Sequence, residues 1–391
     1  MRLESYVSGR WQQGAGEGRP LVNPVNGAEI ARASADGLDM EAALAHARLH
    51  GGAALSAMTF AERGALLKAM ADVLQKNRDA YQETARLNSG NTASDAAIDI
   101  DGGIATLKYY SRLGASLGSA RSIIEPGQDQ LARDPVFFSR HVWTTRPGVA
   151  VGINAFNFPS WGLWEKVAQA LLAGVPSLAK PATATALLSF QMVRDVIQSG
   201  VVPEGVLSLV CGSGEAILDY LGPMDSLAFT GSASTGITFR RALAERAAPP
   251  LLTIEADSVN ATIVGRDVAV GSDLFDLSVR EAVKALSVKA GQLCTNIRRI
   301  LVPAEIAPAF AEAVAAKVKA LAVGDPADEA TRVGPLVNLA QRREAESNIA
   351  RLMTEARLVA RSEMPDAGPQ SGFVAPHLLF CDHPGDARAL H

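Results

Sequence analysis

The residue with the clearest chemical potential is Cys294, in the pentapeptide Gly291-Gln292-Leu293-Cys294-Thr295. It lies between small, flexible neighbours, just before the apolar run at residues 300–302. A cysteine thiolate in such a place can attack a carbonyl carbon, and its own backbone N–H can hold the oxyanion that forms. A lone cysteine is otherwise a small buried hydrophobe. The choice between these two interpretations depends on four other segments.

Two of these segments could complete a reaction at a carbonyl group. Glu255 directly follows the apolar run at residues 251–254, where a carboxylate is costly unless it has a partner or a function. It could be the general base for an attacking water, or one half of a structural salt bridge. Asn157, in the hexapeptide at residues 154–159, could offer its amide as a second oxyanion donor. An Asx turn is the alternative for this asparagine.

The other two segments could hold a phosphate-bearing ligand. Residues 229–236, Phe-Thr-Gly-Ser-Ala-Ser-Thr-Gly, follow an expected strand and open an expected helix. Small residues there allow a phosphate to approach the N–H groups at the positive end of the helix. The segment is not Gly-x-Gly-x-x-Gly, so the usual dinucleotide fingerprint is absent. Lys180 ends another expected strand and could reach a ribose or a phosphate, with a solvated lysine as the alternative.

Alternating strands and helices must position these residues. Strands are expected at residues 149–153, 175–179, 206–210, 226–229 and 251–254, with helices at 162–173 and 187–198 between them. This rhythm predicts a parallel, doubly wound α/β sheet, whose ligands bind at the carboxyl ends of the strands. A second α/β unit is expected from Ala256, with helices at 273–288, 306–321 and 340–358 and a strand at 299–302. The insert at residues 117–141 predicts a protruding hairpin.

The composition limits the class of protein. The chain has 391 residues, 48% of them hydrophobic and 20% charged, which predicts two or three domains with large cores. The net charge of −4 gives no reason to expect nucleic acid or a membrane surface as a partner. No apolar run is long enough to span a bilayer, and the N-terminus lacks a secretory h-region. Three cysteines without a Cys-x-x-Cys pair favour a reducing cytoplasm and no metal site. His46 and His50 have the spacing of two zinc ligands, but a solvated helix face is the favoured interpretation.

Together, Asn157, Lys180, Gly231-Ser232, Glu255 and Cys294, in this order and at these separations, resemble the aldehyde dehydrogenase superfamily. Lesser matches are found at residues 147–149, 323–326 and 334–336, and the resemblance runs from about Asn23 to the last residue. It implies a Rossmann-type NADP-binding domain at 1–122 and 143–255, an oligomerisation hairpin at 123–142 and an α/β catalytic domain at 256–391. It also implies a homodimer or homotetramer. Because the family places a Glu-x-Phe-Gly-Pro motif and an oligomerisation strand beyond the position of His391, we expect this catalytic domain to be incomplete.

The resemblance also implies a mechanism. Cys294 would attack the aldehyde to give a thiohemiacetal, whose oxyanion Asn157 and the Cys294 N–H would hold. Hydride transfer to the nicotinamide would leave a thioester, and Glu255 would activate water to release the acid. Cofactor contacts are implied at Ile153, Asn154, Phe156, Lys180, Thr183, Gly212, Thr230, Gly231, Ser232 and Gly236.

Two departures from the family pattern refine these expectations. Most members carry Leu-Gly-Gly-Lys after the catalytic glutamate, whereas this chain has Ala256-Asp257-Ser258-Val259, followed by Asn260. The motif resembles the branch that contains the aldehyde dehydrogenase part of the phenylacetate ring-opening enzyme and the stand-alone 3,4-dehydroadipyl-CoA semialdehyde dehydrogenases of benzoate catabolism. This branch implies a CoA-linked semialdehyde as substrate. The second departure is Thr183, where NAD-preferring members carry a ribose-binding glutamate, and it favours NADP over NAD.

Three alternatives remain open at this stage. The first is a general dehydrogenase of aliphatic or aromatic aldehydes. The second is a CoA-acylating dehydrogenase, against which Glu255 argues because that reaction needs no water-activating base. The third is a catalytically silent protein on the same scaffold. The aromatic residues Phe156, Phe158, Trp161 and Trp164 could line a substrate tunnel or belong to the core.

Overall fold

The computed structural model describes residues 1–388, which form two compact units. The first unit contains Met1–Arg19, Arg32–Tyr81 and Asp99–Ala256, and the second contains Pro20–Ala31, Gln82–Ile98 and the chain from Asp257 onward. Within residues 1–388, no helix combines the length and the apolar character needed to cross a bilayer.

A seven-stranded sheet forms the centre of the first unit, in the order β14-β13-β10-β11-β12-β2-β3. Five of its strands run parallel: β10 (Ala150–Ile153), β11 (Ser177–Lys180), β12 (Leu207–Leu209), β13 (Ser226–Thr230) and β14 (Leu251–Glu255). The antiparallel hairpin of β2 (Ser5–Val7) and β3 (Arg10–Gln12) extends the β12 edge. The strand order reverses between β10 and β13, which is where sheets of this class bind their ligands. The predicted α/β fold with a mainly parallel sheet is confirmed.

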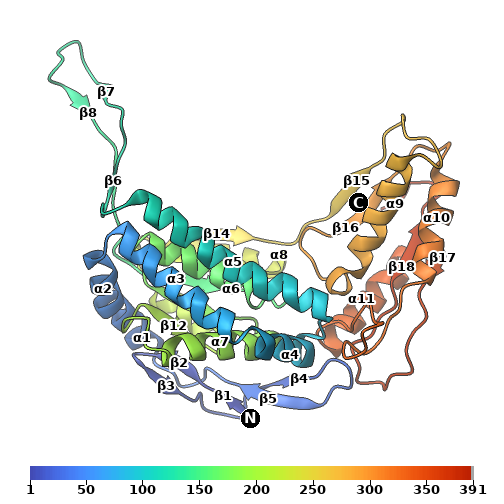
Figure 1. Cartoon of the computed structure of the whole chain (residues 1–391), viewed down its shortest axis with the longest axis horizontal. Helices are drawn as coiled ribbons and strands as arrows, with labels where there is room; N and C mark the ends of the chain where they lie inside the picture. The colour runs from blue at the N-terminus through green and yellow to red at the C-terminus, as the bar shows by residue number, and fades with distance from the viewer. Residues whose placement is uncertain (389–391) are drawn as a thin grey trace. The chain divides into compact units, whose positions relative to one another are not determined.

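Helices cover both faces of this sheet (Figure 1). On one face, α6 (Trp161–Leu172) packs against β10 and β11, and α3 (Phe60–Lys76) packs against α6 and α7 (Ala186–Gln198). On the other face lie α1 (Met40–His46), the π-helical turn Ala47–Gly51, the 3-10 turn Glu215–Tyr220 and α8 (Ala233–Ala244). The remaining elements of this part of the chain are β1 (Arg2–Leu3), β4 (Arg19–Val22), β5 (Glu29–Ala33), α2 (Gly52–Ala57), α4 (Arg78–Ser89), α5 (Ala93–Leu117) and the 3-10 turn Thr183–Thr185.

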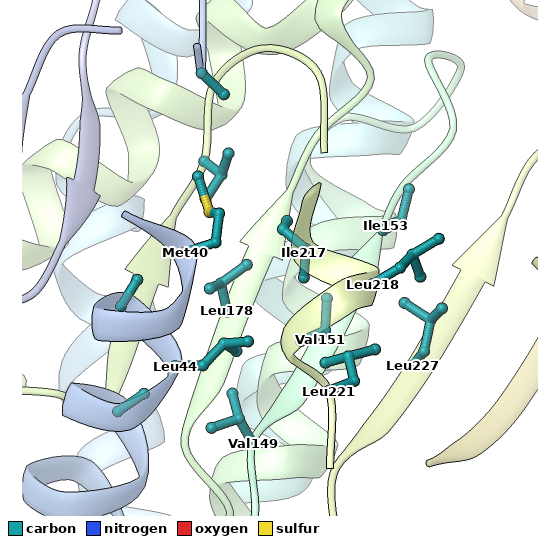
Figure 2. Packing of buried hydrophobic residues seen from close by; sticks show 14 of the residues in the cluster. Met40, Leu44, Val149, Val151, Ile153, Leu178, Ile217, Leu218, Leu221 and Leu227 are labelled. Atoms are coloured by element: carbon teal, nitrogen blue, oxygen red, sulfur yellow. The ribbon is translucent and has the colours of Figure 1, made fainter. Parts of the chain in front are cut away.

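The core on this second face follows from the alternation of side chains along the strands. Val151 and Ile153 of β10, with Val149 directly before the strand, point to one side of the sheet and pack with Leu178 and Leu227 of the neighbouring strands. Figure 2 shows them meeting side chains of α1 and of the 3-10 turn, among them Leu44 and Ile217. Since odd-numbered residues of β10 face this core, Gly152 faces α6 on the other side.

The helix α3 begins at a capping box formed by Thr59 and Glu62. Thr59 accepts a hydrogen bond from the backbone N–H of Glu62, and the Glu62 carboxylate accepts one from the backbone N–H of Thr59. These two bonds satisfy N–H groups that a helix start otherwise leaves unpaired.

The insert after α5 is a hairpin, as predicted. Its strands β6 (Ile123–Ile124) and β9 (Val142–Trp143) pair antiparallel, as do β7 (Asp129–Gln130) and β8 (Phe138–Ser139). Figure 1 shows it extending from the end of α5, away from the sheet of the first unit.

The second unit has its own core. The parallel pair β15 (Asn260–Ile263) and β16 (Ile297–Leu301) packs with α9 (Asp273–Ser287) and α10 (Ala307–Lys319), where Phe275 meets Phe310 edge to face. The antiparallel pair β17 (Arg357–Arg361) and β18 (His377–Phe380) lies against α10, and α11 (Leu339–Leu352) precedes β17.

One predicted helix was wrong at its end. The helix expected at residues 340–358 stops at Leu352, and β17 begins at Arg357. Arg357 and Leu358 pair with Phe380 and Leu379, so a contact across the chain decides their conformation rather than local helical periodicity. The other predicted strands and helices differ from the structure by at most two residues at each end.

Candidate active site

The carboxyl ends of the parallel strands gather the predicted residues of the first unit. Ile153 lies beside both Lys180 and Phe229, and Thr230 lies beside Glu255. Residues that are 25 to 102 positions apart in the chain therefore share one edge of the sheet, because the strands are parallel and in register.

Glu255, the last residue of β14, is the end of a hydrogen-bonded chain of three side chains. The Thr230 hydroxyl donates to Glu255 Oε2 at 3.2 Å, and Lys166 Nζ donates to Thr230 Oγ1 at 2.8 Å. The Glu255 carbonyl also accepts from the Gly231 N–H at 3.1 Å. The carboxylate is exposed, so it can reach a reactant while its second oxygen is held.

Lys166 comes from α6, and its position depends on a small residue in the sheet. A Cβ on Gly152 would lie 3.1 Å from Lys166 Cδ, so the glycine leaves room for the lysine stem to cross β10. Burial lowers the pKa of Lys166, while the negative charges of Glu255 and Glu165 act in the opposite direction. The lysine is therefore a mostly buried cation whose charge the nearby carboxylates support.

Asn157 lies in the loop between β10 and α6, and contacts from other elements fix this loop. Thr185 Oγ1 donates to the Phe156 carbonyl at 3.0 Å, and Ser189 Oγ donates to the Pro159 carbonyl at 2.7 Å. The helix α6 has no side-chain cap of its own, but Asp99 of α5 accepts from the first N–H groups of α6, those of Ser160 and Trp161. Asn157 itself is half-buried.

The aromatic residues near this loop divide between core and surface. Trp164 is fully buried and belongs to the core. Trp161 is partly exposed and meets Phe158 edge to face at 5.8 Å.

Two glycines and a serine cap shape the turn between β13 and α8, where the sequence predicted a phosphate site. Ser232 caps α8, its hydroxyl accepting from the Thr235 N–H at 3.3 Å. A Cβ on Gly231 would lie 2.5 Å from the Phe229 ring, and one on Gly236 would lie 2.9 Å from Ile254. Only glycine at these two positions lets α8 start this close to the strands, so its first N–H groups open at the sheet edge.

Lys180 is the last residue of β11, and Thr183 begins the 3-10 turn that comes shortly after it. The Lys180 side chain lies over Gly214 instead of extending into water, and burial lowers its pKa, while Cys211 and Glu215 act in the opposite direction. The Thr183 hydroxyl donates to the Gly212 carbonyl at 3.3 Å. Cys211 is fully buried, and burial raises the pKa of its thiol to about 12, so it is inert as a nucleophile.

Asn154 gives a test of whether a polar ligand fits this edge. It follows β10 directly, is almost fully buried, and its backbone N–H donates to the Lys180 carbonyl. Neither polar atom of its side-chain amide has a hydrogen-bond partner among residues 1–388. Because buried polar atoms are rarely left unpaired, this amide and the open N–H groups of α8 fit a polar, phosphate-bearing cofactor such as NAD(P).

Cys294 belongs to the second unit and is exposed at the end of a strained turn. Lys289, Ala290 and Gly291 have φ angles of 49°, 53° and 75°, a run of left-handed residues of which two carry side chains. Such residues cost energy and persist only where the surroundings hold them. Here Asp95, itself buried, accepts from the Lys289 N–H at 2.8 Å.

Further contacts hold the rest of this turn. The Gly291 carbonyl accepts from Asn296 Nδ2 and from the Arg298 guanidinium, each at 3.0 Å. The Gln292 side chain spans the turn, donating to the Lys289 carbonyl and accepting from the Val337 N–H. The turn before Cys294 is therefore fixed on both sides.

The carbonyl of Cys294 is also held. The Ser258 hydroxyl donates to it, and Asn260 Nδ2 donates to it at 2.8 Å. Ser258 belongs to the segment that departs from the usual family motif, and Asn260 follows it.

The structure thus brings Ile153, Asn154, Lys180, Thr230, Gly231 and Glu255 to one edge of the first unit, with Asn157 in the adjoining loop. Cys294 lies in the second unit. Sequence reasoning missed Lys166, although a lysine beside the buried Leu163, Trp164 and Val167 was a usable signal. It assigned no role to Asp95, Asp99, Ser258 or Asn260, whose contacts become visible only in three dimensions.

Comparisons with known proteins show the family of the chain. The sequence model of the Aldehyde dehydrogenase family matches residues 11–390. A 3,4-dehydroadipyl-CoA semialdehyde dehydrogenase of Aromatoleum evansii is 47% identical over 397 aligned positions, which cover 100% of this chain and 77% of that protein. Betaine aldehyde dehydrogenase of Staphylococcus aureus in complex with NAD+ matches with a TM-score of 0.84 and 25% identity, over 96% of this chain and 73% of that one. An NADP-dependent enzyme of E. coli matches with a TM-score of 0.83 and 26% identity, over 97% and 76%.

Proposed function

Since the chain belongs to the aldehyde dehydrogenase family, we propose that it oxidises a CoA-linked semialdehyde to the carboxylic acid, with NADP as the hydride acceptor. The family supports NAD(P)-dependent aldehyde oxidation in general. The substrate class is supported by the name of the relative that is 47% identical over the whole chain. A place in benzoate catabolism is part of this proposal.

The proposed nucleophile is Cys294. Its thiolate adds to the aldehyde carbon, and its own N–H and the Asn157 amide donate to the oxyanion of the thiohemiacetal. The meeting of Cys294, from the second unit, with Asn157 and Glu255, from the first, is part of the proposal. Loss of hydride from the thiohemiacetal leaves a thioester on Cys294.

The observation that carries the hydrolytic outcome is the chain from Lys166 through Thr230 to Glu255. The Thr230 hydroxyl holds one carboxylate oxygen and leaves the other to take a proton from water, which then attacks the thioester carbon. Lys166 orients the Thr230 hydroxyl by donating to its oxygen. A CoA-acylating enzyme would need no such arrangement, because its acyl acceptor is a thiol.

The cofactor would lie along the sheet edge that carries the unpaired Asn154 amide. When bound, the nicotinamide accepts the hydride. The N-terminus of α8 and Lys180 would hold phosphate groups, and Thr183 would tolerate the 2′-phosphate that a glutamate would repel. Further cofactor contacts are proposed from the family resemblance, at Ile153, Phe156, Gly212 and Gly236.

We also propose that the hairpin at 123–142 joins copies of the chain into a homodimer or homotetramer. Its exposed apolar residues support this, since such patches mark interfaces: they are Ile123, Ile124, Leu131, Val136, Phe137, Phe138 and Val142. A cytoplasmic location, supported by cysteines that form no disulfide among residues 1–388, stays a prediction.

The test compares products and substrates. The enzyme is mixed with NADP and either the CoA thioester of adipic semialdehyde or hexanal, and products are identified by mass spectrometry. We expect the free acid from the semialdehyde and a higher kcat/KM for the CoA-linked substrate. Equal kcat/KM values would favour a general aldehyde dehydrogenase, and a new thioester formed only when free CoA is added would favour the acylating reaction.

A matched variant tests the base. Glu255→Gln keeps the shape of the side chain but cannot take a proton, so a burst of reduced cofactor should precede turnover slowed about 10²–10⁴-fold. Loss of the burst itself would place Glu255 in an earlier step, such as deprotonation of Cys294.

A further inference from the structure

Two side chains of the segment after Glu255, Ser258 and Asn260, contact the peptide of Cys294. The Ser258 hydroxyl and Asn260 Nδ2 both donate to the Cys294 carbonyl oxygen. A carbonyl oxygen has two lone pairs, so these two donors satisfy it completely. A glycine at position 258 could not make the first of these bonds.

Asn260, one of the two donors, is itself held by several contacts. Asn260 is the first residue of β15 and lies beside Ile297 of β16, where the ladder has an irregularity between Asn260 and Ala261. Its amide also lies 3.1 Å from Ser258 Oγ and 3.3 Å from the Asn296 carbonyl. A side chain mounted on a strand and tied to its neighbours holds its partner more precisely than one on a free loop.

The need for such a support comes from the strained turn that precedes Cys294. Lys289, Ala290 and Gly291 are left-handed, and Asp95 holds the entry to this turn through the Lys289 N–H. Residues in this left-handed conformation return to a more favourable one unless surrounding contacts hold the backbone. Ser258 and Asn260 hold the exit of this turn, at the residue that carries the thiol.

We propose that Ser258 and Asn260 are positioning residues for Cys294. They hold the carbonyl of the peptide that follows Cys294. The Asn296 N–H holds the Leu293 carbonyl, in the peptide that carries the Cys294 N–H. With both flanking peptides held, the Cα of Cys294 presents its N–H and its thiol in a fixed arrangement. Addition of an aldehyde needs both groups at once, the thiol on carbon and the N–H on oxygen. This inference rests on the proposed role of Cys294 as the nucleophile.

The test uses a pair of variants of equal shape. Ser258→Val and Ser258→Thr both add a methyl group at an exposed position, and only threonine keeps the hydroxyl. We expect the burst of reduced cofactor with NADP and hexanal to slow about three- to tenfold in Ser258→Val, which is the worth of one neutral hydrogen bond, and to stay near the parent rate in Ser258→Thr. Asn260→Leu, which removes the second donor, should also slow the burst.

A second readout separates positioning from damage. Alkylation of Cys294 by iodoacetamide, followed by peptide mass spectrometry without cofactor, needs the thiol but not the N–H. We expect its rate in Ser258→Val to stay within about twofold of the parent rate, a change smaller than the loss of one hydrogen bond causes.

Three results would overturn the inference. They are an unchanged burst in Ser258→Val, an equal slowing in Ser258→Thr, and a fall in alkylation that matches the fall in the burst. A parent enzyme that reduces neither NADP nor NAD with hexanal or with the CoA thioester of adipic semialdehyde would refute the proposed function and this inference with it. A normal parent burst that Ser258→Val leaves unchanged would refute this inference alone.

Discussion

Replacement of Thr230 by valine tests how Glu255 is held. The Thr230 hydroxyl links Lys166 to Glu255 by two hydrogen bonds. It accepts one from Lys166 Nζ at 2.8 Å and donates one to Glu255 Oε2 at 3.2 Å. Valine has nearly the same shape and suits a strand equally well, so the sheet should remain intact. The variant leaves the partly buried Lys166 ammonium without this acceptor and the Glu255 carboxylate without this donor.

The expected magnitude follows from the geometry. A hydrogen bond to a charged group is worth about 1.5–3 kcal/mol. The bond to Glu255 is long and the carboxylate is exposed, so the lower part of this range applies. An increase of about 1.5–2 kcal/mol in the barrier to deacylation corresponds to a rate lowered about ten- to thirtyfold.

The assay separates the two halves of the reaction. Rapid mixing of the variant with NADP and the aldehyde should give a burst of reduced cofactor close to the parent rate, because acylation does not use the water-activating base. The slow phase that follows should show the loss. Thr230→Ser keeps the hydroxyl and should restore most of the slow phase.

The reasoning would be refuted by a slow phase in Thr230→Val within about twofold of the parent, a change too small for the loss of a charge-assisted hydrogen bond. A burst rate that falls as much as the slow-phase rate would also refute it, since the hydrogen bonds of Lys166, Thr230 and Glu255 would then serve acylation.

Three further predictions concern the cofactor, the cysteines and pH. Thr183→Glu should lower kcat/KM for NADP relative to NAD by about ten- to a hundredfold, and equal values in the parent would show that Thr183 does not set the preference. Cys294→Ala should abolish aldehyde oxidation, whereas Cys211→Ser should retain it, because burial raises the pKa of that thiol to about 12; activity assays on both variants decide this. Burial and the neighbouring His50 lower the pKa of His46 below 6.5, against the opposing effect of Glu204, so the folded state resists its protonation. The contribution of neutral His46 to the free energy of unfolding should therefore be fully present above pH 6.5 and should be lost as the pH falls below this value. Urea titrations at a series of pH values should show a smaller fall in the free energy of unfolding for His46→Gln than for the parent.

The sequence by itself determined the class of fold and the family. Buried strands such as residues 149–153 and 251–254 carry their own hydrophobic pattern, and amphipathic helices repeat theirs, so both are visible locally. The order of Asn157, Lys180, Glu255 and Cys294 along the chain identified the family, which the comparisons confirm. The catalytic and cofactor roles of the individual residues stay predictions.

Only the tertiary structure decided which side chains meet. Lys166, Thr230 and Glu255 lie on a helix and two strands that are distant in the chain, and the register of β13 with β14 is what aligns them. The same holds for Ser258 and the Cys294 carbonyl, and for Arg357, which the local pattern placed in a helix and strand pairing placed in β17. Local patterns record which residues prefer burial or a given torsion, but hydrogen bonds and strand partners depend on distances that close only when the whole chain has folded.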